Sequence, residues 1–255
     1  MGVFYQTVVH NLSFRQKYVL KALNLTFACT LSNQRRQVMI KTEEWGLIDY
    51  EAALGRQTTL YNEAIATKLA GGRCDETVIT CQHNHVYTLG KSGKDSNMLL
   101  STQRLASLGV QLYHIKRGGD ITYHGPGQIV MYPIIDLEQH HIGLKDYVWR
   151  LEESVITTAG DYGITCGRLK GATGVWIDAG RPTARKICAI GVQSSHYVTM
   201  HGLALNVNTD LSYFNNINPC GFTDKGVTSM AVECGTEIDI KEVRDKLVSN
   251  FLALI

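Results

Sequence analysis

The chain has 255 residues, of which 44% are hydrophobic and 19% charged, and its formal net charge is +2. This composition is that of a globular protein rather than a disordered one, and the length allows one domain or at most two. So small a net charge does not favour nucleic-acid binding through phosphate neutralisation, and no run of about 18 uncharged apolar residues could span a membrane.

The seven cysteines are scattered along the chain without a Cys-x-x-Cys pair; they stand at positions 29, 74, 81, 166, 188, 220 and 234. A disulfide framework or a zinc site would show a paired spacing. Reduced thiols in a cytoplasmic protein are therefore expected, and one of them is a candidate for a reactive group.

Residues 1–38 differ in character from the rest of the chain, because they mix apolar, basic and polar residues without sustained periodicity. The apolar-leaning stretch 18–31 is interrupted by Lys21 and Asn24 and has no clear small-residue cleavage site after it, which disfavours a secretory signal. We expect a poorly ordered extension, or a start codon assigned too early with Met39 as the working start. The catalytic domain is then expected to span residues 39–255.

The first half of this domain alternates helical and strand-like segments. Residues 49–69 have the periodicity of an amphipathic helix with one apolar side, made of Ala52, Ala53, Leu60, Ala64 and Ile65. Residues 77–80 and 85–88 are β-branched or aromatic and predict strands. Ser101 is a plausible N-cap of a short helix that Gly109 ends, and a strand is expected over 110–116.

The second half continues this alternation. Residues 128–137 are almost continuously apolar, which predicts a buried central strand. Helices are expected over 144–162, closed by Gly163, and over 240–254, and short strands over 174–177, 186–192 and 202–207. No repeat or linker divides the chain. The fold class is therefore α/β (α+β type), a single domain of mixed β-sheet packed with helices.

The segment 117–128, Arg-Gly-Gly-Asp-Ile-Thr-Tyr-His-Gly-Pro-Gly-Gln, concentrates the polar and glycine residues. Four glycines between two strand-like runs predict a loop whose backbone can approach a ligand closely. Arg117 is suited to an anionic or carbonyl group, and the Thr-Tyr-His run supplies hydrogen bonds. A plain turn explains the glycines equally well, and the segment matches no phosphate-binding loop.

Two further residues have chemical potential. Cys220 stands in Asn-Pro-Cys-Gly, where the proline sets the backbone and the glycine leaves the sulfur accessible, although most free cysteines are inert and buried. Lys186 begins an apolar strand, where a lysine is most often a solvated charge. His83 and His85, two apart on one expected strand, would face the same side, but no carboxylate or thiol cluster completes a metal site.

Several motifs occur in a fixed order: residues 83–90 (HNHVYTLG), 117–128 (RGGDITYHGPGQ), 173–176 (TGVW), 186–191 (KICAIG), 201–208 (HGLALNVN) and 218–221 (NPCG). Together they resemble the lipoyl(octanoyl) transferase family, a branch of the biotin/lipoate ligase superfamily. The resemblance covers roughly residues 43 to 254 and implies that family's ligase-like catalytic fold. Asn84 stands where the family usually has proline.

The resemblance implies that Cys220 carries the acyl group and that Lys186 is its general acid/base. It also implies substrate contacts from three segments: Arg117, Gly118, Gly119, Asp120, Ile121, Thr122, Tyr123 and His124; Ala189, Ile190 and Gly191; and Gly202, Leu203 and Ala204. Because a nearby ammonium stabilises a thiolate, a Cys–Lys pair can perform acyl transfer without a histidine.

The reaction that the resemblance implies is octanoyl transfer in protein lipoylation. The donor is octanoyl-acyl carrier protein, and the acceptors are lipoyl domains of oxo-acid dehydrogenase E2 subunits and the glycine-cleavage H protein. No cofactor, metal, nucleic acid or membrane is implied.

Three other functions remain open on the sequence. An ATP-dependent lipoate or biotin ligase would share the fold but need no nucleophilic cysteine. A Cys–His thioester hydrolase would need an oriented histidine, and a binding scaffold would need no chemistry.

Overall fold

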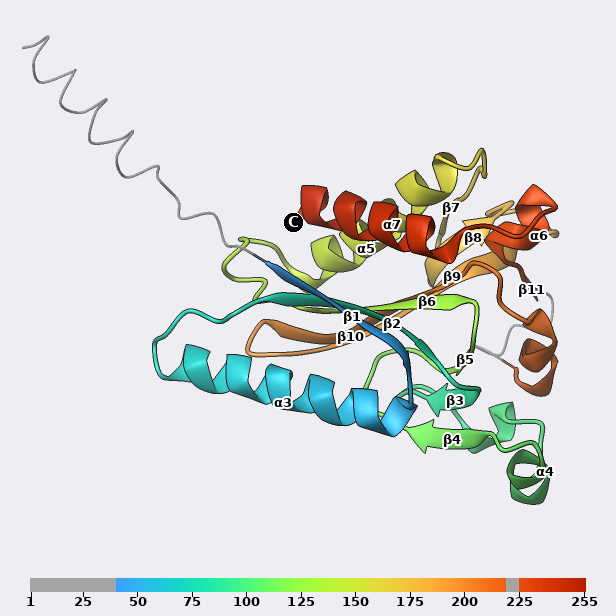
Figure 1. Cartoon of the computed structure of the whole chain (residues 1–255), viewed down its shortest axis with the longest axis horizontal. Helices are drawn as coiled ribbons and strands as arrows, with labels where there is room; N and C mark the ends of the chain where they lie inside the picture. The colour runs from blue at the N-terminus through green and yellow to red at the C-terminus, as the bar shows by residue number, and fades with distance from the viewer. Residues whose placement is uncertain (1–39, 219–224) are drawn as a thin grey trace, which may run out of the picture. The chain divides into compact units, whose positions relative to one another are not determined.

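The computed structural model describes residues 40–218 and 225–255, all within the compact unit Ile40–Ile255 (Figure 1). The expected extension, residues 1–38, and the expected nucleophile Cys220 lie outside these described residues. None of the helices in the described ranges is long and apolar enough to cross a bilayer.

A mixed β-sheet forms the centre of the domain. In the part of the chain that the structure describes it has eight strands, in the order β1-β2-β6-β10-β9-β8-β7, with β11 also pairing with β9. Their bounds are β1 Lys41–Ile48, β2 Thr77–His83, β6 Gln128–Ile134, β7 Gly167–Leu169, β8 Ala172–Ile177, β9 Arg185–Ser195, β10 Val198–Asn206 and β11 Gly226–Val227. The β1–β2 and β11–β9 pairs are parallel and the other pairs antiparallel, so the expected mixed sheet is confirmed.

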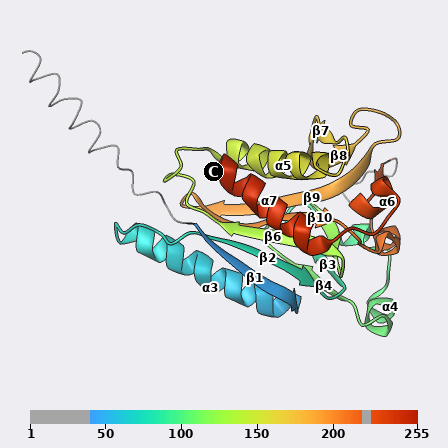
Figure 2. The same ribbon diagram turned by 45° about the horizontal axis from the view of Figure 1, so that its top comes forward.

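Helices cover both faces of this sheet (Figures 1 and 2). Helix α3 (Tyr50–Leu69) packs on one face, and α5 (Leu144–Gly160) and α7 (Ile240–Leu254) lie together on the other. Strand β6 serves both layers because its side chains alternate. Ile129 and Met131 belong to the core under α5 and α7, whereas Val130 and Tyr132 belong to the core under α3.

The expected helices are present, including the short α4 (Thr102–Ser107), whose N-cap Ser101 accepts a hydrogen bond from the Arg104 backbone N–H. The predicted inner face of α3 is only partly right. Ala53 and Ala64 are buried, but Ala52 is exposed, and Gln57 and Tyr61 are buried in its place. The helix therefore buries a stripe that contains polar side chains, which hydrophobic periodicity alone does not detect.

Pro133 lies inside the central strand β6, where a missing N–H would normally break the ladder. Strand β10 pairs with β6 only from Asn206 to Leu203 and does not continue to Pro133. At the proline the hydroxyl of Thr199 bridges the gap in the ladder, since it donates to the Pro133 carbonyl (2.8 Å) and accepts from the Ile135 N–H (3.1 Å). The proline is thus tolerated because pairing with β10 lapses only locally and resumes at Ile135, whose carbonyl accepts from the Thr199 N–H (2.9 Å).

A smaller sheet of three described strands, in the order β4-β3-β5, packs beside the main one; they are β3 Val86–Leu89, β4 Gln111–His114 and β5 Ile121–His124. This sheet corrects two expectations. Residues 121–124 form strand β5 rather than a loop, and His83 and His85 do not share a strand, because the chain bends at Asn84–His85 between the two sheets. A 3₁₀ helix, η2, spans Leu211–Asn216. A second one, η1, spans Asp95–Asn97.

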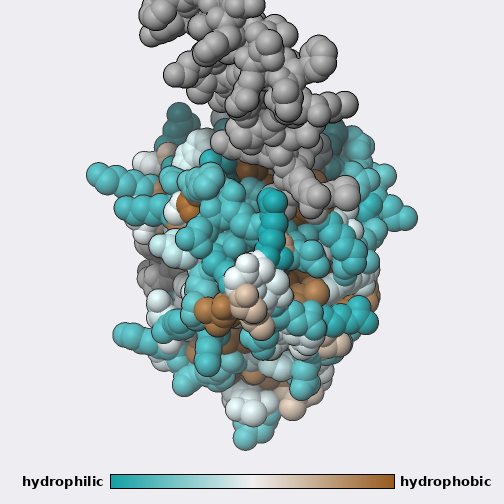
Figure 3. Space-filling model, turned by 90° about the vertical axis from the view of Figure 1, so that its left-hand side faces the viewer, coloured by the Kyte–Doolittle hydropathy of each residue, from teal (hydrophilic) through white to brown (hydrophobic). Residues whose placement is uncertain are grey.

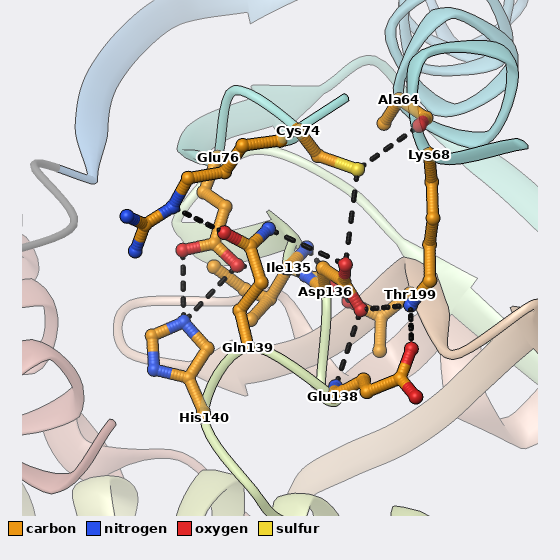
Figure 4. Close-up of polar contacts among 11 residues, drawn as sticks. Ala64, Lys68, Cys74, Glu76, Ile135, Asp136, Glu138, Gln139, His140 and Thr199 are labelled. Atoms are coloured by element: carbon orange, nitrogen blue, oxygen red, sulfur yellow. Dashed lines mark hydrogen bonds and ion pairs between the residues drawn. The ribbon is translucent and has the colours of Figure 1, made fainter. Parts of the chain in front are cut away.

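A cluster of charged side chains joins three segments at the C-terminal end of α3 (Figure 4). Asp136, which follows β6, accepts from Lys68 Nζ (2.5 Å) and from Cys74 Sγ (3.8 Å). The buried Glu76 accepts from the Asp136 N–H (2.8 Å) and pairs with His140 Nε2 (2.8 Å). These contacts tie α3, the segment before β2 and the loop after β6 together.

The face of the molecule in Figure 3 is mainly hydrophilic, with small hydrophobic patches among the polar side chains.

The pair Glu76–His140 predicts a pH-dependent contribution to stability. The hydrogen bond to Glu76 raises the pKa of His140 above its usual value. The pair therefore stabilises the fold fully below the unfolded pKa, about 6.5, and less as pH rises through the folded-state pKa. His140→Gln is expected to lower the free energy of unfolding by about 1–3 kcal/mol near pH 6 and by less near pH 8.5, measured by urea denaturation.

The exposed pair His114–Asp95 provides a matched control, because its side chains are 64% and 82% exposed. His114→Gln should change the unfolding free energy by less than about 1 kcal/mol at either pH. An effect of His140→Gln that does not depend on pH would contradict the prediction.

Candidate active site

A cavity of about 310 Å³ lies on the face of the main sheet that α3 also covers, beyond the N-terminal end of that helix. Side chains from β5, β6, β8, β9, β10 and β11 line it, together with Tyr50 at the start of α3 and Phe214 in η2. This volume is at the small end of the range for ligand pockets, which suits a small and mainly apolar ligand.

The cavity exists because small residues occupy alternate positions on two neighbouring strands. Ala189 and Gly191 stand on β9, and Gly202 and Ala204 stand opposite them on β10, with Gly202 paired to Gly191 and Ala204 to Ala189. Alternate residues of a strand face the same side, so these four positions leave a shallow depression in one face of the sheet.

The loop that carries Arg117 lies over this depression. A side chain at position 191 would bring its Cβ to 2.7 Å from the Gly118 carbonyl oxygen and to 2.9 Å from Arg117 Cδ, so only glycine allows the approach. Arg117 is buried, and its guanidinium donates to the Thr88 carbonyl (2.7 Å), to the Thr88 hydroxyl (2.9 Å) and to the Gly118 carbonyl (3.0 Å). These bonds fix a positive charge at the pocket wall.

A chain of hydrogen bonds crosses the pocket lining from β5 to β11. His124 Nδ1 is bonded to Gln128 Oε1 (2.8 Å), and Gln128 Nε2 donates to Asn206 Oδ1 (2.9 Å). Asn206 Nδ2 in turn donates to the Thr228 carbonyl (2.9 Å). Every member is buried, so the chain holds the first residues of β6 and the end of β10 in one fixed arrangement.

The two histidines that line the pocket are kept neutral by their surroundings. Burial, together with the nearby His83, lowers the pKa of His124 to about 3. Burial and the nearby Arg117 lower the pKa of His201 to about 4. Side chains with such pKa values accept protons poorly at neutral pH, so both act as hydrogen-bonding and space-filling groups.

Lys186 lies at the opposite side of the lining from Tyr132. Its Nζ sits 4.7 Å from the centroid of the Trp176 ring, and its aliphatic stem passes Gly174, where an added Cβ would lie 3.6 Å from Lys186 Cδ and Cε. Strand β11 pairs with β9 at this point, since Val227 is the partner of Lys186.

The segment 219–224, which includes Cys220, is flanked in the sequence by described residues, some of which line the cavity. Before it, Phe214 lines the cavity and the Asn218 N–H donates to the Asn97 carbonyl (2.8 Å). After it, Lys225 and Gly226 line the cavity.

The expected substrate-contacting residues mostly fall on this lining. Those that line the cavity are Arg117, Gly119, Asp120, Ile121, Thr122, His124, Ala189, Ile190, Gly191, Gly202, Leu203 and Ala204, together with Lys186. Gly118 and Tyr123 do not. Tyr123 is fully buried on the other side of β5, where its hydroxyl bonds His85 Nδ1 (2.7 Å) and its ring stacks on Tyr213.

Several lining residues were not expected from the sequence; they are Tyr50, Gln128, Val130, Tyr132, Trp176, Asn206, Phe214 and Lys225. Gln128 is the last residue of the glycine-rich motif 117–128, so its place in that motif could have predicted that it lines the cavity. Among the residues that the structure describes, no group of three or more His, Cys, Asp or Glu side chains could hold a metal ion.

Comparison with known proteins identifies the family. Residues 49–252 match the model of the lipoyl protein ligase A/B catalytic domain. The chain is 56% identical over 214 residues to an octanoyltransferase of Bacteroides fragilis strain YCH46, covering 84% of this chain and 97% of that protein. It is 47% identical to an octanoyltransferase of Cytophaga hutchinsonii, covering 87% and 94%. The chain belongs to the octanoyltransferase family. It is therefore an acyltransferase.

Solved structures share the fold. A bi-partite lipoate protein ligase from Thermoplasma acidophilum superposes with a TM-score of 0.60 at 15% identity, covering 84% of this chain and 83% of that one. A lipoate-protein ligase A bound with ATP gives a TM-score of 0.60 at 15% identity, covering 85% of each chain. The expected ligase-like architecture is thus confirmed, whereas such low identities say nothing of a shared reaction.

The small residues of the depression predict the effect of filling it. Ala204→Leu adds three carbon atoms inside the lining and should lower kcat/KM for an eight-carbon acyl thioester about 5–150-fold, the equivalent of a 1–3 kcal/mol clash. A four-carbon thioester should lose much less, because it leaves part of the cavity empty. Steady-state kinetics with both thioesters measures the difference.

Ala52→Leu, on the exposed side of α3, is the matched control and should leave both rates near those of the unaltered enzyme. Equal losses for the two chain lengths in Ala204→Leu would argue against the cavity as the acyl site.

Proposed function

We propose that this enzyme transfers an octanoyl group from octanoyl-acyl carrier protein to one lysine of a lipoyl domain, with Cys220 as the acyl carrier and Lys186 as general acid/base. The observation that carries the proposal is the pairing of β11 with β9 at Lys186, directly after the segment that contains Cys220. The chain therefore returns to the lysine within seven residues of the cysteine, beside a cavity of suitable size.

In the first half-reaction, Lys186 as a neutral amine removes the proton from the Cys220 thiol. The thiolate attacks the carbonyl carbon of the donor thioester, and the bond from that carbon to the carrier's sulfur breaks. The departing thiolate takes the proton from the Lys186 ammonium. Because one thioester replaces another, this step is close to thermoneutral and reversible.

In the second half-reaction, the ε-amine of the acceptor lysine attacks the Cys220 thioester. Its excess proton passes to Lys186 and from there to the departing Cys220 thiolate. The amide product makes this step downhill, and the shared acyl-enzyme intermediate predicts ping-pong kinetics. Backbone N–H groups near Gly191 or in the 117–127 segment are the candidates for stabilising the oxyanion.

The surroundings of Lys186 support its role. The Arg185 guanidinium, one residue away, is bound by Glu233 (2.7 and 2.5 Å) and by Asp178 (2.6 Å). Thr228 donates from its hydroxyl to Glu233 (2.6 Å) and from its N–H to the Lys186 carbonyl (3.0 Å). Lys186 is thus held on a backbone that cannot shift easily, as a general base requires.

The proposed partners are octanoyl-acyl carrier protein as donor and, as acceptors, the lipoyl domains of oxo-acid dehydrogenase E2 subunits and the glycine-cleavage H protein. The five cysteines in the described residues are all free thiols, which suits a reducing cytoplasm. An ATP-dependent ligase of the same fold would activate a free acid and would not need Cys220.

The acyl-enzyme intermediate can be detected directly. Incubation with octanoyl-acyl carrier protein alone, without acceptor or ATP, should give one octanoyl adduct by intact mass, and Cys220→Ser should abolish it. Cys166→Ser is the matched control, because burial raises the pKa of the Cys166 thiol to about 11 and leaves it unreactive. An adduct that survives Cys220→Ser would overturn the mechanism, and steady release of free octanoate without acceptor would indicate a hydrolase.

Lys186→Ala should slow both half-reactions about 10²–10⁴-fold, since general acid–base catalysis is lost while the cavity stays intact. Rapid-quench measurement of acylation and of transfer would resolve the two steps. The exposed Lys170→Ala is the control and should transfer at the normal rate. Normal transfer by Lys186→Ala would show that the lysine has another role.

A further inference from the structure

The two ends of the cavity can be told apart from the register of the sheet. On β9 and β10, Cys188 pairs with Leu205, and on β10 and β6, Asn206 pairs with Gln128. Lys186, two residues before Cys188, therefore lies at the Gln128 end of the sheet. Tyr132 lies four residues further along β6, about 14 Å away at the rise of an antiparallel strand.

Small or short side chains line the path between these ends. Ala189 and Ala204 face the cavity from β9 and β10, and Val130 faces it from β6, paired with Ala204. An extended chain of eight carbons is about 9 Å long, given carbon–carbon bonds of about 1.5 Å. An acyl chain that starts beside Lys186 therefore spans most of this path, and the ring of Tyr132 occupies the remainder.

The Tyr132 ring leans toward the cavity and is held there. Its hydroxyl is bonded to His83 Nε2 (2.7 Å), and His83 Nδ1 is bonded to the Ile48 carbonyl (2.9 Å). Since Cys81 of β2 pairs with Val130, His83 lies nearer the Gln128 end than Tyr132 does, so this bond draws the ring back over the cavity. Tyr132 is only 4% exposed, so the protein encloses most of its ring.

A second aromatic ring supports the first. Tyr50 also lines the cavity, is 3% exposed, and packs edge-on against His83 with ring centroids 5.2 Å apart. As the first residue of α3, next to the N-cap Asp49, it is fixed by the helix. Behind this wall lies the fully buried polar side chain of Gln57.

We propose that Tyr132, supported by Tyr50, closes the acyl cavity and sets the longest acyl chain that the enzyme accepts. The assignment rests on the proposed function, since Lys186 defines the reacting end. A chain with two more carbons would have to displace the Tyr132 hydroxyl from His83 and press methylenes against buried polar groups, which is costly. Length selection thus comes from a fixed wall, because each added methylene would otherwise improve binding about fourfold.

The test compares carrier-protein thioesters of six, eight, ten and twelve carbons by the kcat/KM of acylation. Tyr132→Leu, which removes the ring, should raise the ratio of decanoyl to octanoyl transfer about tenfold, slightly below the fifteenfold that two methylenes would give in full. Tyr50→Leu should raise the same ratio to a smaller extent, and it keeps the test decisive if Tyr132→Leu does not fold. Tyr132→Phe keeps the ring but loses the bond to His83, so it should raise this ratio less than Tyr132→Leu does.

Tyr61→Leu is the structural control, because Tyr61 is buried on the inner face of α3, in the same core as Tyr132, but does not line the cavity. It should lower the melting temperature without changing the decanoyl-to-octanoyl ratio. Folded Tyr132→Leu and Tyr50→Leu with the ratio of the unaltered enzyme would overturn the assignment, as would an equal change in Tyr61→Leu. Absence of any acylation of the unaltered enzyme would instead overturn the proposed function, and the assignment with it.

Discussion

The structure of the site depends on one steric constraint, the small size of the residues at four facing positions on β9 and β10. Ala189 and Ala204 leave room above the sheet, and Gly191 allows the Gly118 carbonyl and the Arg117 stem to lie against the strand. The Arg117 loop can then bury its guanidinium against Thr88 and roof the cavity. A larger residue at position 191 would lift this loop, and the cavity would become an open surface.

A second constraint connects the cavity to the catalytic proposal. The hydrogen-bond chain from His124 through Gln128 and Asn206 ends on the Thr228 carbonyl, and Thr228 also binds Glu233 and the Lys186 backbone. The floor of the cavity and the short strand β11 are therefore parts of one buried polar network. Such networks specify a single arrangement when every member is satisfied, which is what a positioned lysine needs.

Much of this architecture could be predicted from the sequence, because most elements carry their own signals. The apolar period of 240–254 indicated α7, with Val243, Leu247 and Phe251 buried, and Ser101 indicated the start of α4.

The errors in the prediction from sequence have physical causes. Gln57 is buried in α3 although it is polar, and the bend at Asn84 separates His83 from His85 without any glycine or proline to mark it. Tyr132 stood in an apolar run that indicates core, and only the structure shows that it lines a cavity. The order of motifs predicted Lys186 and most of the other residues that line the cavity. The side of β5 to which Tyr123 points could not be predicted, because it depends on how the strands of the small sheet pair.

The protonation of the site argues for a lysine rather than a histidine as the proton carrier. Burial holds the pKa of His124 near 3 and that of His201 near 4, and both lie close to the Arg117 cation, which disfavours a second positive charge. A Cys–His hydrolase would need one of these rings to become an imidazolium beside the thiolate. That second positive charge would be buried close to the Arg117 guanidinium, which is unfavourable. Lys186 lies on another part of the lining, against the Trp176 ring, whose π face stabilises an ammonium. The electrostatics of the cavity thus separates a neutral, hydrogen-bonding part that can hold an apolar chain from a cationic part that can hold a thiolate, and this separation is what an acyl-transfer site requires.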